Sequence, residues 1–111
     1  MALGRMNVQI TFLEVENDKD QDGFAIKNTR PLLTVRAYKE DKNTTEKWSN
    51  RAVFKDISAL FRIRRNPNLT VTTDMKIECS GKRYNIVSVE NIRNRNMYIE
   101  ILAREEELHN G

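Results

Sequence analysis

The alternation of apolar and polar side chains is the feature that most limits how this chain can fold. Near the start, Val8, Ile10 and Phe12 alternate with Gln9 and Thr11. A period of two places one of these sets on a single face of a β-strand, whereas a helical face repeats every three to four residues. Residues 7–16 are therefore predicted to form a half-buried strand.

Five further segments have strand character and are separated by residues that favour turns. Pro31 has no N–H to donate, so the second strand is expected to begin after it. The predicted strands are Leu32 to Tyr38, residues 52–63, Met75 to Cys79, Tyr84 to Val89 and Met97 to Ala103. The fold class is thus mainly β: a small antiparallel β-barrel or sandwich of about six strands, with a long loop or short helix inserted in the middle.

Local irregularities are predicted at three places. After Phe12 the apolar phase shifts to Leu13, so a bulge or sharp twist is expected there. Asn43 followed by Glu46 resembles a helix start and predicts one short helix in the polar middle segment. The pair Ser80-Gly81 is short enough to close a tight hairpin.

The length of the chain allows a single core. With 111 residues, we expect one domain over residues 1–111, with its core at about 5–104. Mobile loops are expected at about 17–24 and 39–51, and a frayed tail at 105–111.

Composition argues against several classes of function. Cys79 is the only cysteine and His109 the only histidine, and His109 lies in the expected tail. No metal centre, nucleophile or general base is therefore predicted, and we expect a protein that is not an enzyme and has no cofactor or small-molecule substrate. No apolar run approaches the roughly 20 residues of a membrane helix, so no membrane contact is expected.

An acidic segment ends in a glycine: Asp18, Asp20 and Asp22 are followed by Gly23. This matches the first half of a calcium loop, but Thr29 stands where a bidentate glutamate is needed. We interpret the segment as a solvated acidic turn.

Basic residues gather in the second half of the chain, close to aromatic ones. The candidates for contact with DNA or another polyanion are Arg62, Arg64, Lys82 and Arg83. Nucleic-acid-binding barrels combine such residues with stacking aromatic rings. The alternative is that the arginines form a solvated strand face that discourages aggregation. Trp48, alone in a polar segment, must pack on the core or be covered by a partner.

The order of segments resembles the head-closure, or head-tail adaptor, family of tailed bacteriophages and prophages. The resemblance is strongest in Phe61-Arg62-Ile63-Arg64-Arg65-Asn66-Pro67, Thr73-Asp74-Met75-Lys76-Ile77, Gly81-Lys82-Arg83-Tyr84-Asn85-Ile86-Val87-Ser88-Val89 and Tyr98-Ile99-Glu100-Ile101-Leu102-Ala103. Arg5 to Val15 and Val35-Arg36-Ala37-Tyr38 are similar to its first two core strands. Residues 39–52 lack the more apolar stretch typical of the family.

Membership would imply a homo-oligomeric ring under the phage portal that closes the DNA-filled head and joins it to the tail. Such a protein is made in the bacterial host cytoplasm and becomes part of the virion, where it meets portal and tail proteins and, transiently, packaged DNA. Candidate intersubunit or partner contacts are Asp18, Asp20, Asp22, Trp48 and Arg51. The alternatives are a small basic nucleic-acid-binding β-barrel and a related tail-completion protein.

Overall fold

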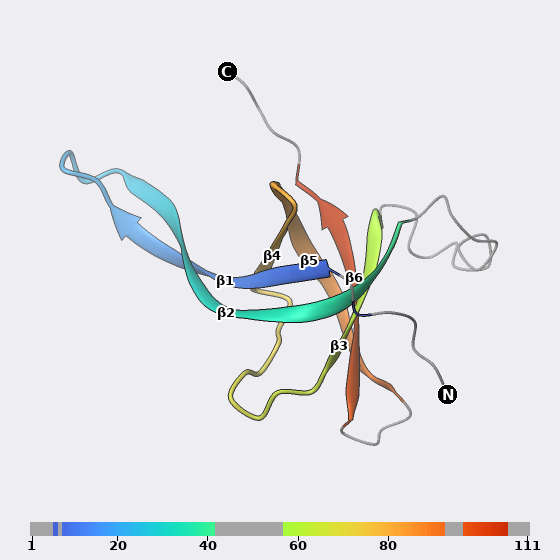
Figure 1. Cartoon of the computed structure of the whole chain (residues 1–111). Coiled ribbons are helices and arrows are strands. Elements are labelled where there is room, and N and C mark those ends of the chain that lie inside the picture. Colours follow the sequence, from blue (N-terminus) through green and yellow to red (C-terminus); the bar gives the residue numbers. More distant parts are fainter. Residues whose placement is uncertain (1–5, 7, 42–56, 93–96, 107–111) are drawn as a thin grey trace.

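The computed structural model describes residue 6 and residues 8–41, 57–92 and 97–106. Its strands are β1 (Val8–Lys19), β2 (Ala25–Asp41), β3 (Ala59–Arg64), β4 (Lys76–Cys79), β5 (Lys82–Asn91) and β6 (Tyr98–Glu105). All pairs are antiparallel, and the strands close into one barrel in the order β1-β2-β3-β6-β5-β4 (Figure 1). The mainly β fold predicted from the alternation is confirmed. Within the described ranges, no helix is long and apolar enough to cross a membrane.

The barrel closes where β1 meets β4. Thr11, Phe12 and Leu13 pair with Glu78, Ile77 and Lys76 respectively. These three residues of β1 are thus paired on both sides, which closes the sheet and removes an edge that could pair with other chains.

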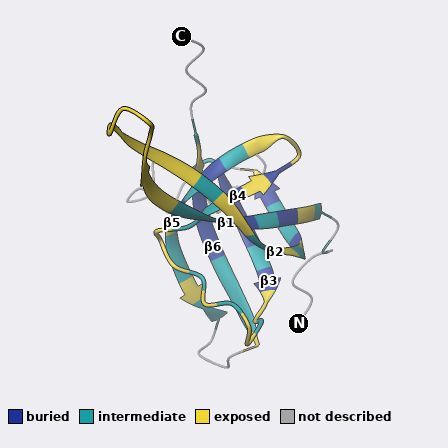
Figure 2. Ribbon diagram, turned by 90° about the vertical axis from the view of Figure 1, so that its left-hand side faces the viewer, coloured by how far each residue is buried: buried dark blue, intermediate teal, exposed yellow. Residues whose placement is uncertain are grey.

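The core fills the inside of this barrel (Figure 2). The fully buried side chains of the main cluster include Ile10, Phe12, Phe61, Ile77 and Ile101. The outer face of β3 and β6 is also partly apolar, because Leu60 and Leu102 are buried in a second cluster with Ile57. The ring of Phe61 meets that of Tyr84 edge to face, with 5.3 Å between centroids and 79° between planes. This arrangement adds to the stabilisation that comes from burial alone.

The bulge expected after Phe12 is present, but the extra residue lies on the partner strand. Phe12 pairs with Leu33 and Leu13 with Pro31, so Leu32 has no partner on β1. The prediction that the strand begins after Pro31 is wrong, because β2 runs through the proline. At Pro31 the strand is paired only with β1, and a bulge on a strand with a free edge is a place where proline is tolerated.

Other boundaries also differ from expectation. The loop expected at 17–24 is shorter than predicted, because β1 continues to Lys19 and residues 20–24 separate it from β2. At the other end, Glu105 belongs to β6 and the Glu106 N–H donates to the Arg83 carbonyl over 2.8 Å, so order extends into the expected tail. The helix expected at Asn43, the strand start at 52–56, Trp48, Arg51 and His109 lie outside the described residues.

The tight hairpin predicted at Ser80-Gly81 is confirmed between β4 and β5. Ser80 and Gly81 have φ values of 53° and 79°, as in the type I′ turn whose twist matches that of antiparallel strands.

Replacing Gly81 by alanine should lower the free energy of unfolding by about 1 kcal/mol, because an L-residue is strained in this left-handed conformation. A Cβ added there meets no atom within 4 Å, so the loss reports backbone strain alone. The opposite change, Ser80→Gly, should leave stability equal or higher. Urea denaturation of both variants measures the difference, and an unchanged Gly81→Ala variant would contradict the turn assignment.

Candidate assembly surface

A two-stranded arm projects from the barrel (Figure 1). We define the arm as residues 14–30, where β1 and β2 pair with each other and with no other described strand. At about 3.3 Å per residue, residues 14–19 carry the chain about 20 Å from the barrel. The molecule accordingly measures 53 × 31 × 24 Å along its principal axes.

One face of the arm combines acidic and apolar side chains. Directly paired residues share a face, so Glu14 lies beside Arg30, Glu16 beside Asn28 and Asp18 beside Ile26. Arg30 binds Glu14 and, at 3.1 Å, Glu16, which neutralises the base of the arm. Beyond this point the face carries acids with the apolar side chains of Ile26 and Phe24.

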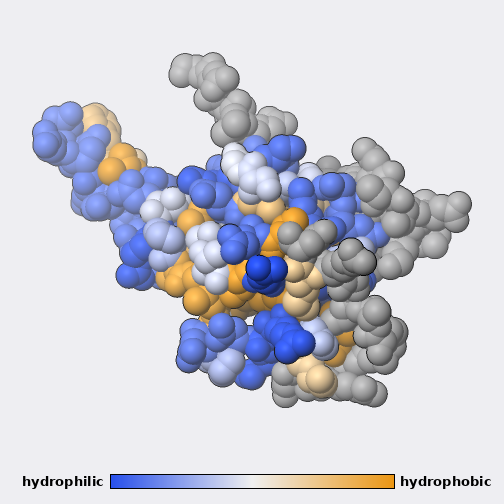
Figure 3. All heavy atoms as spheres, viewed as in Figure 1, coloured by the Kyte–Doolittle hydropathy of each residue, from blue (hydrophilic) through white to orange (hydrophobic). Residues whose placement is uncertain are grey.

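The end of the arm is exposed and apolar as well as acidic. Phe24 is 69% exposed and Ile26 is 37% exposed. Figure 3 shows orange apolar atoms close to the otherwise blue end of the arm. A large aromatic side chain in water is a common mark of a protein interface when it stands beside a second apolar residue.

Asp20 shapes the turn at this end. Its Oδ1 accepts hydrogen bonds from the backbone N–H groups of Asp22 (3.0 Å) and Phe24 (2.8 Å), and its carbonyl accepts from Gly23 N–H at 3.0 Å. This pattern is an Asx turn. The predicted solvated acidic turn therefore has a structural explanation, and the described residues hold no cluster of three or more potential metal ligands.

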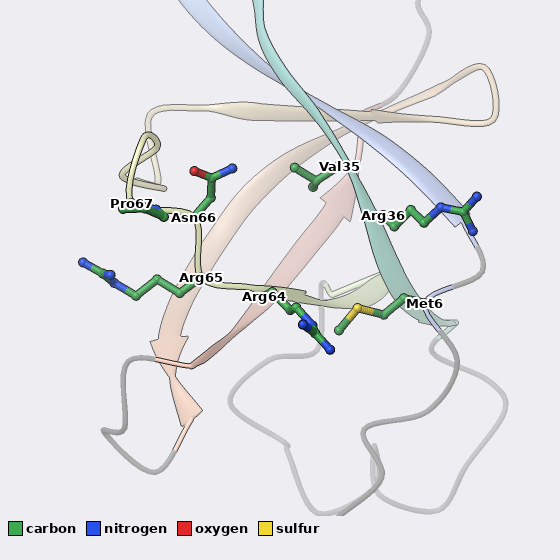
Figure 4. Close-up of a pocket in the computed structure, with 7 residues that line it drawn as sticks. All are labelled: Met6, Val35, Arg36, Arg64, Arg65, Asn66 and Pro67. Atoms are coloured by element: carbon green, nitrogen blue, oxygen red, sulfur yellow. The ribbon is translucent and has the colours of Figure 1, made fainter.

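A cavity of about 470 Å³ opens on the barrel between β2 and the segment after β3. Its lining is Met6, Val35, Arg36, Arg64, Arg65, Asn66 and Pro67 (Figure 4). In the close-up, Val35 points into the space between β2 and the Asn66-Pro67 turn, the Arg64 side chain lies near Met6, and Arg65 projects from the rim. The Arg36 side chain extends from the other side of β2, away from this space (Figure 4). The cavity thus combines apolar walls with the side chain of Arg64 and with arginines around its rim.

The turn after β3 forms one wall of this cavity. Asn66 Oδ1 accepts the Asn68 N–H at 2.9 Å and the Asn66 carbonyl accepts the Leu69 N–H at 3.1 Å. The Arg65 N–H donates to the Met97 carbonyl over 2.9 Å, which ties the start of the turn to β6. The backbone of Arg65 and the turn that follows it are therefore held in place by hydrogen bonds.

Among the described residues, charged side chains form ion pairs over much of the barrel, but those at the arm end and around the cavity do not. Lys76 binds Glu106 at 2.9 Å, Lys82 binds Glu105 at 3.2 Å and Arg83 lies 3.6 Å from Glu78. The arginines of the cavity, Arg36, Arg64 and Arg65, and the acids at the arm end, Asp18, Asp20 and Asp22, form no ion pair with any described residue. Unneutralised charge of opposite sign thus lies at two separate sites of the molecule.

The predicted polyanion-binding residues are not brought together. Arg64 pairs with Tyr98 at one end of β6, whereas Lys82 and Arg83 lie at the β4–β5 hairpin next to the other end. Arg62 binds Glu100 on the outer face of β3. Of the set, Arg64 is the one that lines the cavity.

Arg62 belongs to a half-buried polar cluster on that outer face. Its Nε donates to Glu100 Oε2 over 3.0 Å, and its guanidinium lies 5.5 Å from the centroid of the Tyr38 ring. Burial, together with the charge of Glu40, raises the pKa of the Tyr38 hydroxyl, although Arg62 opposes this. Tyr38 also packs on Ile57, Leu60 and Leu102, so this face is well covered.

Replacing Arg62 by methionine should lower the free energy of unfolding by about 2 kcal/mol, because Glu100 loses a charged donor in a partly buried site. The side chains of Arg62 and Glu100 are 16% and 11% exposed. Arg30→Met on the exposed arm is the matched control and should cost less than about 1 kcal/mol. Equal losses in urea denaturation would contradict this difference in burial.

Sequence reasoning missed Phe24, Ile26, Arg36 and Arg65. The strongest available indication was Phe24 itself, a large apolar residue that follows the acidic segment 16–23. The arginines gave no such indication, because only the fold brings β2 next to the turn after β3.

Comparisons with known proteins agree with this architecture. The chain is similar to protein SF1141 from Shigella flexneri 2a, known from a solution structure, with a TM-score of 0.70 and 18% identity over 95% of this chain and 96% of that one. It is also similar to a chain from the virion of a native gene transfer agent particle, with a TM-score of 0.64 and 16% identity over 96% and 99% of the two chains. No match is found among curated proteins.

The two TM-scores show that the fold is shared. The family is shown by a sequence model described as phage head completion protein, which matches residues 1–106. The predicted resemblance to head-closure proteins is thereby confirmed. The chain belongs to the phage head completion protein family and has a structural role in phage head assembly.

Proposed function

We propose that the chain forms a homo-oligomeric ring beneath the portal, closes the DNA-filled head there and offers a surface on which the tail docks. The observation that carries this proposal is the arm, which holds Phe24 69% exposed about 20 Å from the barrel. An apolar side chain in that position contributes nothing to the core of its own subunit. It is suited to contact with a neighbouring chain.

The charge distribution supports a ring in particular. A closed ring needs two unlike surfaces on each subunit, so that each copy contacts the next in the same way. The acidic arm end and the arginines of the cavity are two such surfaces. The gene transfer agent neighbour, which is described as part of a virion, supports the same kind of setting.

The test is co-assembly with the portal protein of the same phage. Purified chain is mixed with portal rings, and with DNA-filled heads that lack it, and the complexes are separated by sedimentation. We expect the chain to sediment with both and to reduce the loss of DNA from the heads. Failure to join portal complexes would contradict the proposed function, whereas a monomer in isolation would not, since the portal can template the ring.

Binding to nucleic acid as the main function has less support. Arg62, Lys82 and Arg83 each contact a carboxylate of the same chain, so their charges are already partly neutralised. Transient contact of the assembled ring with passing DNA remains part of the proposal. Weak binding to short oligonucleotides that falls steeply with salt is the expected result, because phosphate contacts release counterions.

A further inference from the structure

We propose that the end of the arm of one copy docks in the arginine-rimmed cavity of the next copy. This inference rests on the proposed homo-oligomeric ring and names the two surfaces that meet in it. On one side are Phe24, Ile26 and the acids Asp18, Asp20 and Asp22. On the other are Arg36, Arg64 and Arg65 with the apolar wall of Met6, Val35 and Pro67.

The two surfaces match in apolar character. Phe24 and Ile26 are the large apolar residues that the arm leaves exposed. A cavity of about 470 Å³ is large enough to receive such side chains, and its walls include Val35 and Pro67. Docking removes both apolar surfaces from water, which is the main favourable term in association.

They also match in charge. Asp20 is committed to the turn, where its carboxylate accepts two backbone N–H groups. Asp18 Oδ1 accepts only the Lys19 N–H, at 2.8 Å, and retains oxygen lone pairs for a guanidinium. Arg64 and Arg65 form no ion pair with the described part of their own chain. Arginine and carboxylate pair with defined geometry, so these charges fix the orientation of the arm.

The arm cannot reach the cavity of its own subunit. Ile26 and Val35 lie on the same strand, β2, and about 30 Å of extended chain separates them. Contact therefore joins two copies through unlike surfaces. Repetition of such a contact closes a ring when the rotation between copies is suitable.

A phosphate of the packaged DNA is the other occupant that arginines would attract. The cavity walls argue against it, because Val35, Met6 and Pro67 offer nothing to a phosphodiester, whereas they fit Phe24. An arm that is acidic around its apolar residues would also be repelled by DNA, so the complement of this cavity is the arm.

Disulfide trapping tests the contact directly, even when it is short-lived. One variant carries Asp22→Cys at the arm end, which leaves Phe24 and Asp18 in place, and an isotope-labelled second variant carries Pro67→Cys at the cavity. Native Cys79 is buried at 2% exposure and does not interfere. After mild oxidation of the mixture, we expect mixed disulfides well above the half share that random collision gives, both in free solution and on portal rings.

Charge reversal shows whether the trapped contact is the proposed one. Adding Arg64→Glu and Arg65→Glu to the cavity variant should lower the mixed product to the half share of random collision, because like charges then face each other. The control is Lys82→Glu with Arg104→Glu, the same charge change away from the cavity, which should leave the yield unchanged. A thermal melt of each variant confirms that it is folded.

The outcomes separate this inference from the function on which it depends. If the chain joins portal rings but mixed disulfides stay at the random share, the docking of arm in cavity is wrong and the ring stands. Equal loss with both pairs of charge reversals also overturns it. If the chain never joins portal rings, the proposed function fails first.

Discussion

Replacing Phe61 by alanine is expected to lower the free energy of unfolding by about 3–5 kcal/mol, the cost of a cavity left by a large aromatic side chain. Phe61 is fully buried and meets the ring of Tyr84 edge to face at 5.3 Å. Domains of this size are stable by only about 5–15 kcal/mol. A large part of the stability of the barrel is therefore at risk from this one change.

Phe24→Ala is the matched control for the same deletion of atoms. Its side chain is 69% exposed on the arm, so its loss should change stability by less than about 0.5 kcal/mol. Urea denaturation followed by circular dichroism measures both variants. A large loss for Phe24→Ala would show that the arm packs on the barrel and would contradict its free projection.

In contrast to its small effect on stability, a change at Phe24 should have a large effect on assembly. Phe24→Asp is expected to lower the affinity of the chain for its assembly on portal rings by about 30-fold or more, since an interface anchor contributes about 2–4 kcal/mol. The physical reason is that a negative charge replaces the apolar side chain that, in the proposed ring, enters the neighbouring subunit. Sedimentation with portal rings over a range of protein concentrations gives the shift.

Val87→Asp is the control for this prediction. Val87 is also an exposed apolar residue, at 38%, but it belongs to β5 and neither forms part of the arm nor lines the cavity. Its assembly should match that of the wild type. If both variants lose assembly equally, the loss reports a general effect of added negative charge, and the arm has no special part in it.

The strands of the barrel could be predicted because each is marked by a pattern of side chains within a short segment of sequence. The alternation of Val8, Ile10 and Phe12 with polar residues predicts which face of the strand points into the core. Burial in the structure follows the same alternation. The slip after Phe12 predicted the bulge for a similar reason. The prediction at Pro31 was wrong because the tolerance for proline depends on whether a second strand pairs at that residue. The register shows that β3 pairs with β2 only at Tyr38 to Asp41.

The candidate site could not be predicted in this way, because it depends on which distant segments the fold brings together. The arm has polar residues on both faces, so the alternation that reveals a strand is missing there. Residues 17–24 were therefore predicted as a loop, and the second strand was expected to begin only after Pro31. The basic residues were predicted to form one binding surface, but strand pairing places them at separate sites. Arg62 is opposite Glu100 on β6, and Arg83 is opposite Glu78 on β4. Trp48 and Arg51 lie outside the described residues, so their predicted contacts stay predictions.

The arm and the barrel share a ladder of backbone hydrogen bonds but draw on different side chains. Residues of the arm beyond Val15 contribute nothing to the main buried cluster. Mutations there are thus expected to be nearly neutral for folding, while in the proposed ring they would alter what the arm binds. Selection can therefore change the partner preference of such a protein from one virus to another without first having to rescue its stability.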